Sequence, residues 1–190
     1  MRALMLLVSL LTLVACVHVA HYPESWEAIS PDARSTNCAD IVGTYQNKGE
    51  NADGRAVLLA NWLDPTLNQW NTPERTRVAH ELASAQRVEL ALTHVALQVT
   101  AIGAGTRRQW SYRYACRQGK VHIPRQGDMS GDNVALIGSD AIDLYRAKSH
   151  LVVNRHGAWA GVAMLIPVIG YDSAWARFSL EENTEPGAPQ

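Results

Sequence analysis

Apolar residues along the chain change from a helical to a strand spacing at about residue 87. Before that point, residues 55–64 place their apolar side chains on one helical face, and residues 72–86 open with a Thr-Pro pair, which is a typical helix start. After it, apolar and polar residues alternate, which is the period of a half-buried strand. The pattern therefore predicts one or two short helices near residues 55–86, followed by a longer stretch of strands.

Short turn motifs separate the predicted strands. A first strand is expected around Gly43, and tight turns are expected at residues 103–106 and 117–120. A polar loop is expected at residues 124–133, and a further turn at residues 156–159. Local turns favour antiparallel neighbours, because parallel strands need long crossovers. The predicted fold class is therefore mainly β: an antiparallel meander closed into a small barrel or sandwich.

The N-terminus is an apolar run behind a basic start. Arg2 follows Met1, and residues 4–14 are apolar apart from Ser9 and Thr12. As a helix, about 13 residues would span ~20 Å, whereas the hydrocarbon core of a bilayer is ~30 Å thick. The run therefore predicts a secretory signal rather than a permanent membrane span.

The run ends in Leu13-Val14-Ala15-Cys16, which resembles the lipobox of bacterial lipoproteins. The resemblance implies that residues 1–15 are a signal peptide, that the Cys16 sulfur receives a diacylglyceryl group, and that the new amine is acylated after cleavage. Among lipoproteins, an Asp directly after the modified Cys favours the inner membrane, and here that position is Val17. The resemblance therefore implies a lipid-anchored protein on the periplasmic face of the outer membrane.

Ordinary signal cleavage, for instance after Ala20, is the alternative, and it would discard Cys16. It would place His18, a bulky polar residue, at the position that prefers a small side chain. Lipidation therefore remains the leading expectation.

The chain has three cysteines, and lipidation of Cys16 leaves Cys38 and Cys116. An exported protein meets an oxidising compartment, so we expect these two to form a disulfide. The closed loop of about 78 residues would contribute ~4 kcal/mol on the chain-entropy model. Two unpaired, buried thiols are the alternative.

The remaining chain divides into three predicted parts. Residues 16–37 mix Pro, Ser and charges with no sustained period, so they predict a flexible tether behind the lipidated Cys16. Residues 38–181 form a single β-rich domain, and residues 182–190 form a disordered polar tail.

Composition and motifs exclude several function classes. The formal net charge of -1 leaves no electrostatic footprint for nucleic acid. Residues 80–84 (HELAS) lack the second His of a zinc-protease motif, and residues 127–133 (GDMSGDN) lack the Gly at the sixth place of a calcium loop. No spacing makes zinc ligands converge, so surface or strand-edge positions are expected for His94, His122, His150 and His156. We expect no metal, no cofactor and no enzymatic activity.

Gly43-Thr44-Tyr45 resembles the Gly-x-Trp that opens the first strand of lipocalins and related small barrels. That resemblance implies a barrel floor plugged by the aromatic residue. The leading expectation is a non-enzymatic accessory domain that binds an envelope protein, and the alternative is a carrier for a small apolar ligand. A cavity with aromatic walls would favour the carrier, whereas a filled core with an apolar patch outside would favour the interaction domain. The candidate ligand-binding residues are Tyr45, Trp110, Tyr112 and Tyr114.

Overall fold

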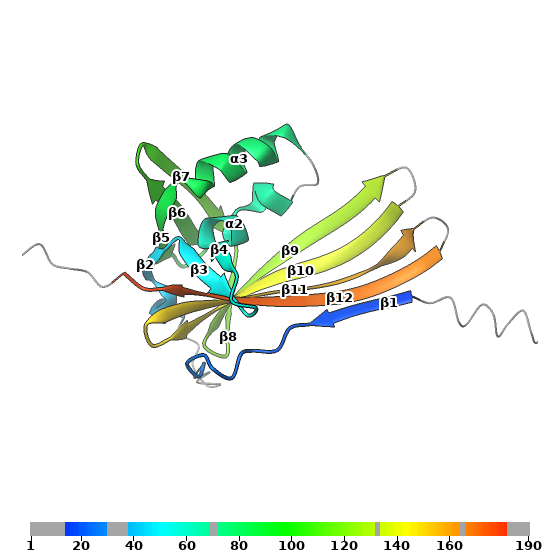
Figure 1. Cartoon of the computed structure of the whole chain (residues 1–190), viewed down its shortest axis with the longest axis horizontal. Helices are drawn as coiled ribbons and strands as arrows, with labels where there is room; N and C mark the ends of the chain where they lie inside the picture. Colours follow the sequence, from blue (N-terminus) through cyan, green and yellow to red (C-terminus); the bar gives the residue numbers. More distant parts are fainter. Residues whose placement is uncertain (1–13, 30–37, 69–71, 132–133, 164–165, 182–190) are drawn as a thin grey trace, which may run out of the picture.

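A computed structural model describes residues 14–29, 38–68, 72–131, 134–163 and 166–181. In these residues, two β-sheets and two helices form a body, from which four long strands extend to one side (Figure 1). The predicted mainly β fold is confirmed. Neither sheet closes on itself within the described ranges, so the architecture is a sandwich and not a closed barrel.

The larger sheet has the strand order β4-β3-β12-β11-β10-β9-β8, and β1 pairs in parallel with the outer part of β12. All its other pairs are antiparallel. Its strands are β1 (Val14–Val19), β3 (Lys48–Asn51), β4 (Ala56–Leu58), β8 (Ala115–Arg117), β9 (Lys120–Gly131), β10 (Val134–Ala147), β11 (His150–Ala163) and β12 (Ile166–Ser179).

The smaller sheet has the order β2-β5-β6-β7 and is antiparallel throughout. The predicted tight turns at residues 103–106 and 117–120 are confirmed, because they separate β6 from β7 and β8 from β9. The strands of this sheet are β2 (Gly43–Gln46), β5 (Ala85–Leu92), β6 (Leu97–Gly103) and β7 (Thr106–Tyr112).

Two helices lie where the helical spacing predicted them. α3 (Pro73–Ala83) begins at the Thr-Pro pair, and the Thr72 hydroxyl accepts a hydrogen bond of 3.2 Å from the Arg75 amide. α2 (Leu59–Leu63) is shorter than expected, because the residues before it form β4 and pair with β3. Two short 3₁₀ helices complete the list: η1 (Ala39–Ile41) and η2 (Pro65–Asn68).

The core lies between the two sheets, and the helices cover it from one side (Figure 1). The alternation predicted from residue 87 onward therefore places one face of each strand in this core. The smaller sheet contributes Tyr45, Val88, Leu90, Leu97 and Val99; the larger sheet contributes Val121, Ile123, Ile142, Leu144, Leu151, Val153 and Phe178; the helices contribute Leu59, Leu63, Val78 and Leu82.

Two predicted breaks in the meander are wrong. Residues 124–131 continue β9, while residues 132–133 of the expected loop lie outside the described residues, and residues 156–159 lie within β11. As a result, β9 to β12 are 12 to 14 residues long. Gly157, which suggested the second break, lies instead within β11, aligned with Asp140 of β10 and Asp172 of β12.

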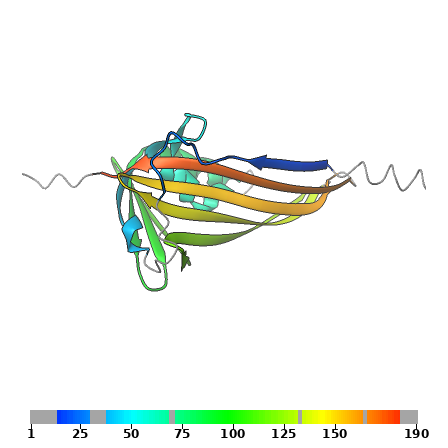
Figure 2. The ribbon, with the colours of Figure 1, turned by 90° about the horizontal axis from the view of Figure 1, so that it is seen from below.

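The four long strands project beyond the body as a single curved layer (Figures 1 and 2). We call this projection the arm, and it comprises residues 125–131, 134–140, 157–163 and 166–172. β1 lies along the β12 edge of the arm, with residues 14–19 aligned to residues 168–173.

The segment expected to be a flexible tether is packed onto the larger sheet for much of its length. Residues 16–19 belong to β1, and residues 20–29 follow the outer face of the body; residues 30–37 lie outside the described residues. Trp26 is 8% exposed, and the Ala20 carbonyl accepts a hydrogen bond of 3.0 Å from the Trp175 indole. Tyr22 and Trp26 supply the packing surface of this segment, and two aromatic residues four positions apart do not make a sustained periodic pattern in the sequence.

Candidate functional site

Cys16, the predicted lipidation site, lies in β1 with its backbone aligned to Gly170 of β12. β1 runs in parallel with β12, so the chain proceeds from the arm toward the body after Cys16 (Figure 1). Only Val17 to Val19 separate Cys16 from the segment packed on the body. The backbone of residue 16 is therefore part of a strand at the edge of the arm, and no flexible linker separates it from the arm.

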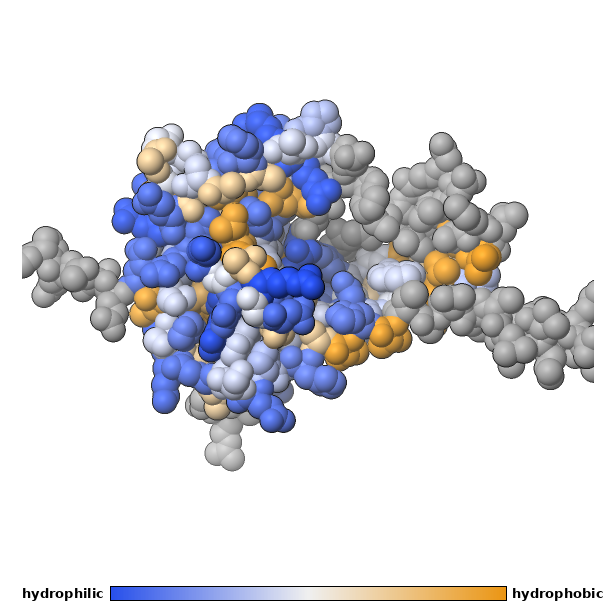
Figure 3. All heavy atoms as spheres, viewed as in Figure 1, coloured by the Kyte–Doolittle hydropathy of each residue, from blue (hydrophilic) through white to orange (hydrophobic). Residues whose placement is uncertain are grey.

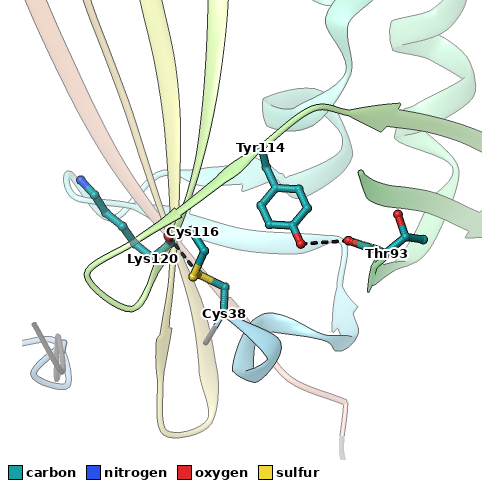
Figure 4. The surroundings of a disulfide bond; sticks show 5 residues. All are labelled: Cys38, Thr93, Tyr114, Cys116 and Lys120. Atoms are coloured by element: carbon teal, nitrogen blue, oxygen red, sulfur yellow. Dashed lines mark hydrogen bonds between the residues drawn. A yellow bond between two sulfur atoms is a disulfide. The ribbon is translucent and has the colours of Figure 1, made fainter. Parts of the chain in front are cut away.

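The predicted disulfide between Cys38 and Cys116 is present, with a Cα–Cα distance of 5.9 Å (Figure 4). Cys38 precedes η1 and leads into β2 of the smaller sheet, whereas Cys116 lies in β8 at the edge of the larger sheet. The bond therefore ties the two layers of the sandwich together at one side.

Tyr45, the first candidate ligand-binding residue, is completely buried in the core. Its hydroxyl donates a hydrogen bond of 2.8 Å to the Ile41 carbonyl and accepts one of 3.0 Å from Arg146. Burial raises the pKa of Tyr45, although the nearby Arg146 opposes this rise. These contacts are those of a core residue whose polar tip is satisfied.

The other three candidates direct their polar tips to the backbone. The Trp110 indole donates a hydrogen bond of 3.1 Å to the Leu63 carbonyl, and the Tyr112 hydroxyl donates to the same oxygen. The Tyr114 hydroxyl donates to the Thr93 carbonyl at 2.9 Å (Figure 4). All three side chains pack against the main core, so in the described structure their contacts stabilise the sandwich.

A surface hollow in the described structure lies beside β3 and the body end of β12. None of the four candidate aromatic residues lines it. Its lining is largely polar and includes Lys48, Glu50, His150, Arg177 and Ser179.

A cluster of titratable residues on the outer face of the larger sheet was not predicted from the sequence. Asp143 of β10 is the direct cross-strand partner of His122 of β9, and His156 comes from the neighbouring strand β11. His122 Nδ1 lies 2.6 Å from Asp143 Oδ1, and His156 Nε2 lies 3.3 Å from Asp143 Oδ2. These residues are 21 and 13 positions apart in sequence, so only the strand register brings them together.

The three side chains of this cluster offer donor atoms that lie within 4.8 Å of one another, which is compatible with a metal ion. However, Lys120 Nζ lies 2.5 Å from Asp143 Oδ2. A metal ion would therefore have to displace an ammonium group from the same carboxylate. In the described structure the cluster forms an ion pair extended by two imidazoles.

The electrostatics of the cluster follow from this arrangement. Burial by itself would raise the pKa of the Asp143 carboxyl, but the hydrogen bonds from Lys120 and His122 outweigh it and hold this pKa below its usual value. Partial burial would lower the pKa of Lys120, but the bond to Asp143 outweighs this effect and raises it. The Asp143–Lys120 pair is therefore charged over a wide pH range.

Apolar side chains are concentrated on the arm and β1. Nine large apolar residues are exposed among the described residues, and only Val42 and Val95 lie elsewhere, in loops of the body. Figure 3 shows this apolar surface extending beyond the mainly hydrophilic body. The exposed residues on the arm and β1 are Val17, Val19, Ile137, Val162, Ile166, Ile169 and Tyr171.

A row of charged residues lies on the inner face of the arm, at the end where the arm joins the body. Arg125, Asp140, Gly157 and Asp172 occupy one cross-strand row. The guanidinium groups of Arg125 and Arg155 each lie 3.8 Å from an Asp140 oxygen. Beyond this row, residues 157–171 contain no charged residue. Along β11 and β12 the arm therefore changes from charged to apolar, whereas β9 carries Asp128 opposite Ile137.

Comparisons with protein-family models, with curated proteins and with solved structures return no match to this chain. Among the described residues, no helix is both long enough and apolar enough to cross a membrane.

Proposed function

We propose that the chain is a bacterial lipoprotein, anchored through Cys16 on the periplasmic face of the outer membrane, and that it acts there as a non-enzymatic interaction domain. The observation that carries this proposal is the place of Cys16, at the edge of an arm whose exposed side chains are largely apolar. The lipobox ends at the same residue, so the sequence motif and the apolar surface coincide.

The disulfide supports export. Cys38 and Cys116 are joined, and disulfides persist in oxidising compartments such as the periplasm. Acyl chains on Cys16 contribute ~0.8 kcal/mol per buried methylene, so two or more chains anchor a protein stably.

An interaction role is supported by the edge of β9. Within the described residues, β8 pairs only with residues 120–122, so residues 124–131 of β9 leave a backbone edge without a strand partner. Such an edge can receive an extended segment of another protein by strand addition. An envelope protein is the partner class that this location provides.

The test of the anchor is metabolic labelling with palmitate followed by membrane fractionation. We expect wild type to incorporate palmitate and Cys16→Ser to lose the label. Cys116→Ser is the matched control, because it removes one sulfur of the disulfide and leaves the lipobox intact. Absence of label in wild type would refute the anchor.

The test of the outer-membrane location is Val17→Asp, because Asp at this position favours inner-membrane retention in similar lipoproteins. We expect the variant to move to the inner-membrane fraction of a density gradient. Val17→Asn, which has a similar size without the charge, is the control. An unchanged distribution of the Asp variant would count against the proposed location.

A further inference from the structure

The exposed apolar residues of the arm have a definite position relative to Cys16. Gly170, the backbone partner of Cys16, is four residues from Ile166 at the end of β12. At ~3.3 Å per residue, the end of this strand lies about 13 Å beyond Cys16, in the direction away from the body. Any acyl chains on Cys16 would therefore begin beside the arm rather than beside the body.

The order of residue types along β11 and β12 matches the order of layers at a membrane surface. The charged row with Arg125 and Asp140 lies nearest the body. Trp159 and Tyr171 follow, and Ile166 and Ile169 lie at or beyond the level of Cys16. Trp and Tyr prefer the headgroup level of a bilayer, whereas aliphatic side chains prefer the acyl region.

The packing of the N-terminal segment leaves the arm little freedom to move away from the anchor. Val17 and Val19 are aligned with Tyr171 and Ser173, and the next residues are bonded to the body. A lipid on Cys16 would thus hold the arm at the bilayer surface. The exposed apolar side chains would then face lipid, which removes them from water.

We infer that the distal end of the arm is a second membrane contact, inserted into the same leaflet that holds the acyl chains of Cys16. This inference rests on the proposed lipid anchor. The contact is interfacial: apolar faces of membrane-surface segments enter about 5–10 Å into the headgroup and acyl boundary. Ile137, Val162, Ile166 and Ile169 form the inserted surface.

The experiment places an environment-sensitive fluorophore at single introduced cysteines in the lipidated protein. Ile137→Cys and Ile169→Cys report on the arm, and Val95→Cys is the matched control, since Val95 is an equally apolar exposed residue on the body. Only the introduced thiol reacts, because Cys38 and Cys116 are joined and Cys16 carries lipid. The protein is reconstituted in vesicles of phosphatidylethanolamine and phosphatidylglycerol.

We expect a blue-shifted emission that nitroxide-labelled lipids quench at Ile137 and Ile169, and neither effect at Val95. Arm labels that behave like the Val95 label in vesicle-bound protein would overturn the inference. A blue shift without lipid quenching would also overturn it, because it would show that a second protein chain covers the arm.

A further measurement separates this inference from the proposed anchor. If wild type incorporates no palmitate, the anchor fails, and vesicles are then added to the same labelled variants in the Cys16→Ser background, where the introduced thiol is again the one that reacts. Quenching at Ile137 and Ile169 would still support the membrane contact of the arm, whereas no quenching would overturn it. The double variant Ile137→Asp with Ile169→Asp should lower vesicle binding of unlipidated Cys16→Ser protein at least tenfold, while Val95→Asp should leave it unchanged.

Discussion

The indole of Trp159 occupies the space beside Gly170 on the neighbouring strand: a Cβ atom at Gly170 would lie 2.1 Å from Trp159 Cζ2. The two residues are direct cross-strand partners in the arm. We therefore expect Gly170→Ala to force the indole out of its position and to destabilise the arm by about 1–3 kcal/mol. Hydrogen exchange of the β11 and β12 amides measures this loss locally.

The control for this prediction is a double-mutant cycle with Trp159→Ala. Removing the indole frees the space, so Gly170→Ala should cost much less in the Trp159→Ala background than in wild type. Equal costs in the two backgrounds would show that the glycine is required for another reason.

Loss of the disulfide should destabilise the sandwich, because the bond joins strands of different sheets across a long loop. We expect Cys38→Ser or Cys116→Ser to lower the free energy of unfolding by about 2–4 kcal/mol and the melting temperature by several degrees. Urea unfolding under oxidising conditions measures the change. The double variant is the control, and its free energy of unfolding should fall no further than that of either single variant. A fall equal to the sum of the two single losses would contradict a bond between Cys38 and Cys116.

Asn47 connects three elements from a fully buried position. Its side-chain amide donates hydrogen bonds to the carbonyls of Leu82 and Ala85, and its oxygen accepts one of 2.8 Å from the Ala60 amide. Asn47→Ala would leave these backbone groups without partners, so we expect a loss of about 3 kcal/mol in urea unfolding.

Asn51→Ala provides the comparison for Asn47. Asn51 also bonds backbone amides, those of Asp53 and Arg55, but in an exposed turn where water can replace its side chain. Asn51→Ala should lower the free energy of unfolding by less than about 1 kcal/mol. Similar losses for the two variants would contradict the role given to burial.

The parts of this fold that were predictable from sequence are those fixed by local pattern. The alternation at Val88 and Leu90 identifies core-facing strand positions, and the number of cysteines identifies the disulfide pair. Register and long-range packing were not predictable. The segment from His156 to Trp159 resembles a turn until its cross-strand neighbours are known.

The candidate site shows the same division between local and long-range information. The lipobox is a contiguous motif, so Cys16 was identifiable. The docking of β1 and of Trp26 on the sheet depends on partners more than a hundred residues away, including Trp175. The His122–Asp143–His156 cluster depends on three strands in register, and no single sequence spacing encodes it.

Lys120 controls whether the His122–Asp143–His156 cluster can bind a metal ion. Its ammonium group lies 2.5 Å from the carboxylate oxygen that a metal would use. We therefore expect Lys120→Met to bind Zn²⁺ at least tenfold more tightly than wild type in calorimetric titration. In this variant no ammonium group repels the zinc ion or competes with it for the Asp143 carboxylate. Adding His156→Gln to the Lys120→Met background should remove the gain, and a gain that persists would place the ion elsewhere.

The Asp143–Lys120 pair predicts a specific dependence of stability on pH. The folded pKa of Asp143 lies below its unfolded value, so its stabilising contribution is present above about pH 4 and is lost as pH falls through the folded pKa. The folded pKa of Lys120 is raised, so its contribution is present below about pH 10 and is lost as pH rises through the folded pKa. Between these limits the contribution of the pair should be constant.

Asp143→Asn tests this dependence, because it keeps the size of the side chain and removes its charge. In urea unfolding, we expect wild type to exceed the variant by about 2 kcal/mol between about pH 5 and about pH 9, since hydrogen bonds to a charged group contribute about 1.5–3 kcal/mol. Below about pH 4 the difference should shrink, because the wild-type carboxyl takes up a proton and loses its attraction for Lys120. Asp53→Asn, which removes a charge from an exposed turn, controls for the change in net charge. A difference between wild type and Asp143→Asn that grows as the pH falls would have the opposite sign, and would show that burial, rather than the bonds from Lys120 and His122, dominates the pKa of Asp143.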